Sequence, residues 1–571
     1  MLRATTDANQ NVALEACEYW LTFASLDSDT CTVEMSEAVK VLLPELVPIL
    51  VKGMVYPPEK VEELIELNQA DERLGDDHAK DIAPVFHKAK TKGAGTTAVL
   101  SHDDITDEDD EGSDGVSDDD TYDEREWSLR TCSAAALDTL SVAYPNDDIL
   151  PHLLPVLQQS LGHVDPWIRE AGVLALGAVS SGCYQQLGVH MSQLHPFLME
   201  HLVSVDSLPQ LKSISIWTLS RYADWAAGQV LSGIQPDLLA RLTDSILTCV
   251  CSNNRRVQIA ACSAISDIVE RFPELMEYYV EVILDQFAQA LLRYQTRSLL
   301  VILDAIGTIA DFVGSTIWRG PAIHRCLASI LRIWVQRASK NPFDRPLLSL
   351  MESLASIASS GGVNIQPFAL EFFENSMLTI EMCTISLVSG QYDMDDADPI
   401  VCATDLLDGL VEGLGNNFST LVSSSIKYGH AFVNVLKTLI GHDVSAVRMS
   451  AFALLGDLAK YSPSVIQDGI TEFIHEAIYN IDPSYPLICN NAVWALGEIC
   501  VKCRGNPLIL EPFAADIVQN LIVVLMNSNY EDEDGVTATG LAENAATTLG
   551  RLAIVNPTFV TRDVTRCLIS W

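Results

Sequence analysis

Basic residues are scarce in this chain of 571 residues. Lysine and arginine together number 35, against 76 aspartates and glutamates, and the formal net charge is −41. A surface with this excess of negative charge repels phosphate backbones and anionic lipid headgroups, and it attracts basic partners. The composition therefore argues against direct nucleic-acid binding and favours basic protein ligands.

Long uncharged apolar runs and a secretory signal are also missing. The segment from Met1 to Gln10 has no apolar core and no small-residue cleavage site. No stretch of about 20 uncharged apolar residues follows, so we expect no membrane span. The 14 cysteines are scattered singly along apolar stripes, which is typical of reduced, buried thiols in a cytosolic or nuclear protein.

Metal-binding and catalytic motifs are absent as well. Cys500 and Cys503 have metal-type spacing, but no second cysteine pair or histidine couple accompanies them. The sequence contains no phosphate-binding P-loop, no nucleophile elbow and no zinc-protease histidine pair. The 12 histidines are dispersed, and none lies in a motif beside a candidate nucleophile. We therefore predict a protein that is not an enzyme and that holds no metal or other cofactor.

The sequence does contain a repeated helical pattern. An alanine-rich segment ending in a small or acidic residue and then an apolar one recurs at spacings of 39, 43 and 46 residues, and later of 47, 41 and 53 residues. The aligned residues are Asp138, Gly177, Ser220, Ser266, Gly409, Gly456, Gly497 and Gly550. A period of about 40 to 47 residues with two helices per unit is typical of HEAT and armadillo arrays. We therefore predict an all-α HEAT-repeat solenoid.

The first helix of each repeat is expected upstream of the aligned segment. These upstream stretches are apolar and carry a proline, such as Pro151 or Pro196, near their expected start. Proline fits the first turn of a helix because its missing N–H has no partner there. Small residues in the aligned segments, such as Ala171, let neighbouring helices approach closely.

An acidic insertion interrupts the predicted array. Between Asp103 and Glu126 lie fourteen acidic residues and one base, Arg125, without hydrophobic periodicity. Such a run buries too little apolar surface to order itself. We therefore predict HEAT repeats over 1–101, an acidic disordered loop over 102–126 between the two helices of one repeat, and HEAT repeats over 127–571. The loop is either a solvated spacer or a mobile polyanion that competes for a basic site.

The second helices of the repeats are predicted to line a concave wall. On one of them Ile214, Trp217 and Arg221 share a stripe, since residues three, four or seven apart lie on one helix face. Later helices continue the stripe with Ser263, Glu270, Asp304, Asp311, Asp405, Glu412, Asp457, Asn490, Trp494 and Glu498. An aromatic site, an acidic stretch and a second aromatic site suit an extended ligand with a basic middle. Alternatively, the tryptophans pack between repeats and the acids form a solvated face.

Several segments resemble the transportin (karyopherin-β2) family of nuclear import receptors. They include RTCSAAALDTL, ISIWTLSRYADW, SAFALLGDL, CNNAVWALGEI and ENAATTLGRL, and the resemblance covers nearly the whole chain, acidic insertion included. It implies that this chain is a fragment containing the C-terminal, cargo-binding arch, which binds extended basic proline-tyrosine nuclear localisation signals. It also implies release linked to Ran-GTP through the acidic loop, contact with nucleoporin FG repeats, and shuttling between cytoplasm and nucleus. Ran-GTP would bind mainly the N-terminal arch, which is mostly missing, and we expect a monomer.

The resemblance also implies roles for individual residues. The Pro-Tyr end of the signal would meet Ala134, Ala135, Leu174, Ile214 and Trp217, with Asp138 and Arg221 offering polar contacts. The basic part would lie near Ser263, Glu270, Asp304 and Asp311. The upstream part would meet Asp405, Glu412, Asp457, Asn490, Trp494 and Asn544. The chain departs from the family at Ile259, Val401, Thr547 and residues 483–487. These departures concern the contacts with the upstream part of the signal more than those with Pro-Tyr.

A scaffold of a multi-subunit complex, such as a phosphatase, is the alternative function. A scaffold needs folded partners, whereas a transportin binds an isolated basic peptide that ends in Pro-Tyr. The two functions also predict different places for Trp217 and Trp494. Both side chains should be exposed on one face in a transportin and packed between repeats in a scaffold.

Overall fold

The computed structural model describes residues 1–26, 32–72, 127–144, 146–294, 296–389, 397–527, 538 and 540–560. Within these ranges the chain consists of α-helices, short 3-10 helices and their connections, without a strand. It divides into two compact units, described separately below. Unit 1 contains the helices from α1 to α16, unit 2 those from α18 to α27, and α17 (Ala322–Ala338) is divided between them.

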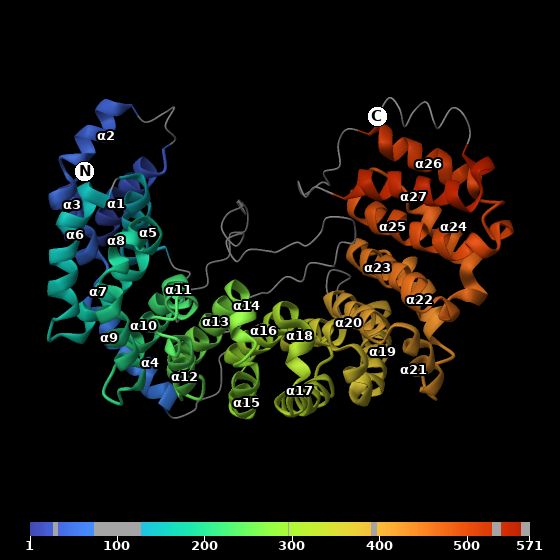
Figure 1. Ribbon diagram of the computed structural model, residues 1–571, viewed down its shortest axis with the longest axis horizontal. Coiled ribbons are helices and arrows are strands. Elements are labelled where there is room, and N and C mark those ends of the chain that lie inside the picture. The colour runs from blue at the N-terminus through green and yellow to red at the C-terminus, as the bar shows by residue number, and fades with distance from the viewer. Residues whose placement is uncertain are drawn as a thin grey trace. The chain divides into compact units, whose positions relative to one another are not determined.

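With the exception of α4, unit 1 is a stack of helices in chain order (Figure 1). Its α-helices are α1 (Gln10–Ala24), α2 (Val33–Lys40), α3 (Leu43–Gly53), α4 (Pro58–Glu72), α5 (Leu129–Ala143), α6 (Asn146–Leu161), α7 (Pro166–Ala178), α8 (Ser180–Gly188), α9 (Met191–Val203), α10 (Pro209–Arg221), α11 (Ala223–Leu231), α12 (Leu238–Val250), α13 (Arg255–Arg271), α14 (Pro273–Met276), α15 (Val280–Ala290) and α16 (Thr296–Val313).

Unit 2 is built in the same way (Figure 1). It begins with the 3-10 helix η4 (Gly314–Trp318), and its α-helices are α18 (Pro346–Gly361), α19 (Gln366–Val388), α20 (Asp398–Leu414), α21 (Phe418–Ser424), α22 (Phe432–Ile440), α23 (Ser445–Tyr461), α24 (Ile470–Tyr479), α25 (Pro486–Lys502), α26 (Ala514–Met526) and α27 (Leu541–Val555).

Each unit has two layers of helices. In unit 1 the second helices α1, α5, α7, α10, α13 and α16 contact one another in succession, and in unit 2 the second helices are α18, α20, α23, α25 and α27. First helices pack against the second helices of the same repeat, as α9 does against α10 and α24 against α25. This arrangement of paired helices confirms the predicted all-α HEAT-type array. All eight aligned segments of the sequence form second helices.

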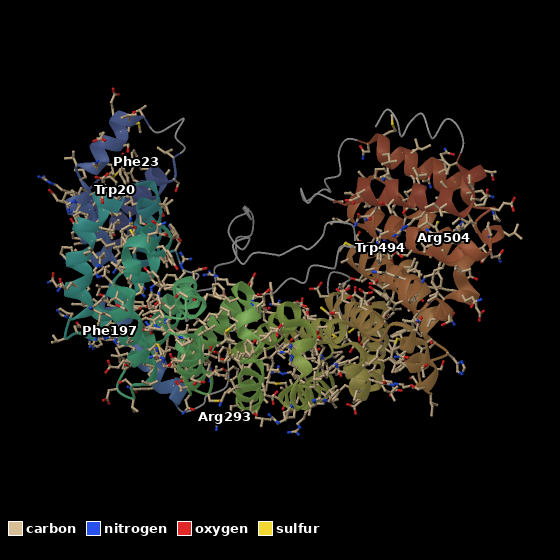
Figure 2. All side chains as sticks on the ribbon, in the orientation of Figure 1. Trp20, Phe23, Phe197, Arg293, Trp494 and Arg504 are labelled. Atoms are coloured by element: carbon tan, nitrogen blue, oxygen red, sulfur yellow. The ribbon has the colours of Figure 1, made fainter. Side chains whose placement is uncertain are left out.

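Two of the second helices in unit 1, α5 and α7, begin at side chains that satisfy free backbone N–H groups. Ser128 and Thr131 form a reciprocal capping box at α5. At α7, whose first residue is Pro166, the side chain of the N-cap residue Asp165 accepts a hydrogen bond from the backbone N–H of Trp167. The core then follows from the helical period, since Ile216 and Leu219 of α10 are fully buried. Figure 2 labels Trp20 and Phe23, two buried residues of α1.

Two first helices begin earlier than predicted. Helix α6 begins at Asn146 and α9 at Met191, so Pro151 and Pro196 lie inside these helices. The predicted acidic loop, 102–126, lies outside the described residues.

Among the described residues, one segment has the length and composition of a membrane span. It joins α16 to η4, Thr296–Trp318, and more than half of its most apolar window is buried inside the protein. Two aspartates, Asp304 and Asp311, are exposed within it. A long core helix of a soluble repeat array has the same composition, so this segment is weak evidence for a membrane span.

A buried histidine makes the stability of unit 1 sensitive to pH. His195 in α9 is fully buried, and among the described residues neither ring nitrogen has a hydrogen-bond partner. Burial, and to a lesser extent the charge of Arg241, lowers the pKa of His195 from 6.5 to about 4. Since the unfolded chain binds the proton more tightly, the stability is complete above pH 6.5 and is lost as the pH falls toward 4. The loss is on the order of 3 kcal/mol.

We expect His195→Leu to raise the melting temperature at pH 7 and to flatten its decline between pH 6.5 and 4.5. An unsatisfied buried polar group costs about 1–3 kcal/mol, which leucine does not incur. Thermal unfolding across this pH range, with the exposed His190→Leu as control, checks the prediction. Burial also lowers the pKa of His201 to about 4, so part of the decline should remain. A decline as steep as in the parent protein would contradict the prediction.

Candidate ligand-binding sites

The first candidate site lies on three successive second helices of unit 1. Helix α5 contributes Ala134, Ala135 and Asp138, α7 contributes Leu174, and α10 contributes Ile214, Trp217 and Arg221. All seven side chains are partly exposed, while their helical neighbours at the core are buried. The structure therefore brings together on adjacent helices the residues predicted to meet the Pro-Tyr end of a signal. We call this set the Trp217 site.

The indole of Trp217 occupies a place that a glycine leaves open. A Cβ atom at Gly177 of α7 would overlap Cζ3 of Trp217 and would also lie 2.8 Å from Oγ1 of Thr218. Thr218 itself donates a hydrogen bond of 3.1 Å to the carbonyl oxygen of Val173. The ring therefore packs against the preceding second helix and is also partly exposed, which is intermediate between the two placements predicted from the sequence.

Arg221 connects α10 to α8 and α5. Its Nε donates to Oγ of Ser180 at 2.9 Å, and Nη2 donates to Oγ of Ser181 at 3.1 Å. Nη2 also lies 3.8 Å from a carboxylate oxygen of Asp138. The guanidinium carbon is 5.7 Å from the centroid of the Trp217 ring, within the range of a cation–π interaction. These contacts hold Arg221 beside the indole.

Asp138 presents an acceptor at the edge of this site. Its Oδ1 atom is buried and has no hydrogen-bond partner among the described residues. Burial raises the pKa of Asp138, and the charge of Arg221 opposes that shift. The other oxygen, Oδ2, faces Arg221, and the side chain as a whole is 36% exposed, so the carboxylate can accept a hydrogen bond from a ligand.

Acidic residues follow on the next two second helices. Ser263 and Glu270 of α13 are partly exposed, and Asp304 and Asp311 of α16 are exposed. The spacing of seven within each pair places both members on one face of their helix. This face concentrates negative charge within unit 1 and suits a basic ligand.

A second tryptophan in unit 2 repeats the geometry of Trp217. A Cβ atom at Gly456 of α23 would overlap Cζ3 of Trp494, which belongs to α25. The Trp494 side chain is partly exposed and is labelled in Figure 2. Glu498, one turn later, is buried and accepts a hydrogen bond of 2.7 Å from Arg551 of α27.

The predicted amides of unit 2 are buried and connect its second helices. Asn544 of α27 donates to Oδ1 of Asn490 at 2.9 Å, and Asn490 donates to Oδ1 of Asn491 at 3.2 Å. Asn491 then donates to the carbonyl oxygen of Met449 in α23 at 3.0 Å. This chain of hydrogen bonds gives Asn490 and Asn544 a structural role in addition to the predicted contact with a ligand.

Acidic side chains of unit 2 form a compact group. Asp405 and Asp457 are only 2% and 1% exposed, whereas Glu412 is partly exposed. Sequence reasoning missed Asp408, which is fully buried four residues before Glu412 on α20. Carboxylate oxygens of Asp408, Glu412 and Asp457 lie within 4.8 Å of one another. Such a concentration of negative charge favours a cationic group, including the ammonium or guanidinium of a basic side chain.

Proteins of known name resemble this chain in sequence over nearly its whole length. No family model matches the chain. The chain is 33% identical to Transportin-1 of Mus musculus over 588 aligned residues, which cover all of this chain and 60% of the mouse protein. The chain thus spans about three-fifths of that relative. The relatives that match over nearly the whole chain are named as transportins or importin subunits, in agreement with the prediction that it is not an enzyme.

Solved structures resemble the fold at much lower identity. An importin-β crystal structure superimposes with a TM-score of 0.59 at 13% identity, covering all of this chain and 66% of that protein. A Kap95:Nup1 complex gives a TM-score of 0.56 at 15% identity, covering 99% of this chain and 70% of that one. These neighbours agree with an α-helical HEAT-type array.

Proposed function

This chain belongs to the transportin family, and from that membership we propose that residues 1–571 bind the nuclear localisation signals of cargo proteins for import. The ligand would be an extended, basic segment with a Pro-Tyr pair near its end. The net charge of −41 favours such a segment.

The Trp217 site is the observation that carries this proposal. Its partly exposed indole offers apolar contact area at low entropic cost, as binding hot spots do. Leu174 and Ile214 add aliphatic surface that suits the ring of a proline. The partly exposed carboxylate of Asp138 suits a donor such as a tyrosine hydroxyl. The site thus has the chemistry of a receptor for Pro-Tyr.

The other candidate residues would bind the remainder of the signal. The acids of α13 and α16 would attract its basic part, and exposed acids contribute mostly to the association rate and to salt dependence. Trp494 and Glu412, which are partly exposed in unit 2, would meet the upstream part.

Transport through the nuclear pore would bring further partners. The Kap95:Nup1 complex is a nucleoporin complex of a protein with the same fold, so we propose that this chain too contacts nucleoporins. Release of cargo by Ran-GTP, linked through residues 102–126, and shuttling between cytoplasm and nucleus complete the proposed role.

Calorimetric titration with two synthetic peptides tests the proposal. The first carries a basic segment followed by an arginine and, a few residues on, Pro-Tyr; in the second, Ala-Ala replaces Pro-Tyr. We expect the first to bind, more weakly as salt rises, and the second to bind at least tenfold more weakly, which is about 1.4 kcal/mol. Equal binding of both peptides, or none by a chain shown to be folded, would overturn the proposal and favour the scaffold.

A further inference from the structure

Helix α4 lies across the starts of two second helices that are distant from it in sequence. The side-chain amides of Asn68 and Gln210, the second residue of α10, exchange hydrogen bonds of 3.0 and 3.1 Å. Asn254, the N-cap residue of α13, donates to the same Oδ1 of Asn68 at 3.0 Å. One amide of α4 is therefore hydrogen-bonded to both α10 and α13.

Asp71, three residues later, completes the cap of α13. Its Oδ2 accepts a hydrogen bond of 3.1 Å from the backbone N–H of Arg255, the first residue of α13. Its Oδ1 lies 3.6 Å from Nε of the same arginine, and the carboxylate is almost fully buried. A carboxylate at a helix N-terminus satisfies a free N–H and interacts favourably with the helix dipole. Here the cap comes from another repeat, 184 residues away in the sequence.

Tyr56, just ahead of α4, extends these contacts. Its ring packs edge-on against Trp167, in the first turn of α7, with centroids 5.7 Å apart. Its hydroxyl accepts a hydrogen bond of 3.5 Å from Arg256 of α13. The segment 56–71, which we call the α4 strap, thus touches the starts of α7, α10 and α13.

We infer that the α4 strap positions α13 relative to α10, and with it the acidic residues relative to the Trp217 site. In a repeat array each repeat normally contacts only its neighbours, which leaves the offset between successive helices compliant. The strap follows α3, which packs against α5, and it reaches past α7 to α10 and α13. It therefore pre-organises two sites that one extended ligand would occupy together, and pre-organisation lowers the entropic cost of binding. This inference rests on the proposed function.

Hydrogen exchange tests the strap without any ligand. The variants Asp71→Ala and Asn68→Ala remove its contacts, and Glu66→Ala and Gln69→Ala are matched controls on the exposed face of the same helix. We expect the first-turn amides of α13, above all that of Arg255, to exchange about tenfold faster in Asp71→Ala than in Glu66→Ala. Equal exchange in the two variants would show that α4 does not hold α13.

Binding of two peptides then tests the positioning role. A spanning peptide contains the basic segment and Pro-Tyr, and a short peptide contains only the Pro-Tyr end. We expect Asp71→Ala to weaken the spanning peptide about fivefold and to leave the short one unchanged, because the short one needs no fixed offset. Equal effects on both peptides, or no effect on either despite faster exchange, would overturn the positioning role. Failure of the parent protein to bind either peptide would overturn the proposed function, while exchange still decides whether the strap holds α13.

Discussion

Trp217→Ala is expected to weaken binding of the Pro-Tyr peptide at least thirtyfold, since truncation of a central aromatic anchor costs about 2 kcal/mol or more. The partly exposed indole lies beside the guanidinium of Arg221, one turn later on α10, so its loss removes both the apolar contact surface and the ring next to that cation. Titration of the variant with the spanning and the short peptides measures the effect, and both should be weakened alike.

Two further variants separate binding from packing. Trp225→Ala removes a partly buried indole from α11, outside the Trp217 site, and should destabilise the protein without changing affinity. Trp494→Ala should weaken only peptides that carry the upstream part of the signal. If Trp217→Ala lowers the melting temperature but leaves both affinities intact, the ring is a packing residue and the scaffold function gains support.

The repeat pattern predicted the HEAT-type array because the pattern depends only on residues within each repeat. Each aligned segment combines alanines with a helical period of apolar residues, and these features alone determine which face packs. The residues of the Trp217 site were likewise predictable, since Ile214, Trp217 and Arg221 lie on the face opposite the buried Ile216 and Leu219. A helix period is enough to separate exposed from buried positions within one repeat.

Contacts between distant segments could not be predicted in this way. Asp71 lies in a polar stretch before the acidic insertion, and nothing in its neighbourhood indicates that it caps α13. Asp408 is not among the residues predicted from the sequence, and it is fully buried. Sequence periodicity gives the face of a helix, whereas burial of a charge depends on which other segments cover that face.

The glycines at aligned positions carried a signal that sequence analysis did not use. Trp217 and Trp494 each lie three residues before the aligned residue of their own repeat, and the preceding repeat has glycine at its aligned position. In both cases the ring fills the space where a Cβ would lie. A tryptophan at this position therefore requires glycine one repeat earlier, and this pairing is readable from the sequence.

The same pairing leads to an expectation for Gly177→Ala, which alters no residue that touches the ligand. The added methyl overlaps the Trp217 ring, and overpacking of this kind costs about 1–3 kcal/mol, more than the gain of up to about 1 kcal/mol from alanine's helix propensity. The ring must shift, so we expect lower stability and about tenfold weaker binding of the short peptide. Calorimetry and thermal unfolding check both.

Gly550→Ala is the matched control, because a Cβ at that position of α27 meets nothing within 4 Å. It should stabilise the protein slightly and leave affinity unchanged. A double-mutant cycle isolates the contact with the ring: in a Trp217→Ala background only the 2.8 Å approach to Oγ1 of Thr218 remains, so Gly177→Ala should then cost no further affinity and less stability than in the parent protein. Additive losses in the double variant would mean that Gly177 acts on the site by another route, for instance through the nearby hydroxyl of Thr218, and not through the indole.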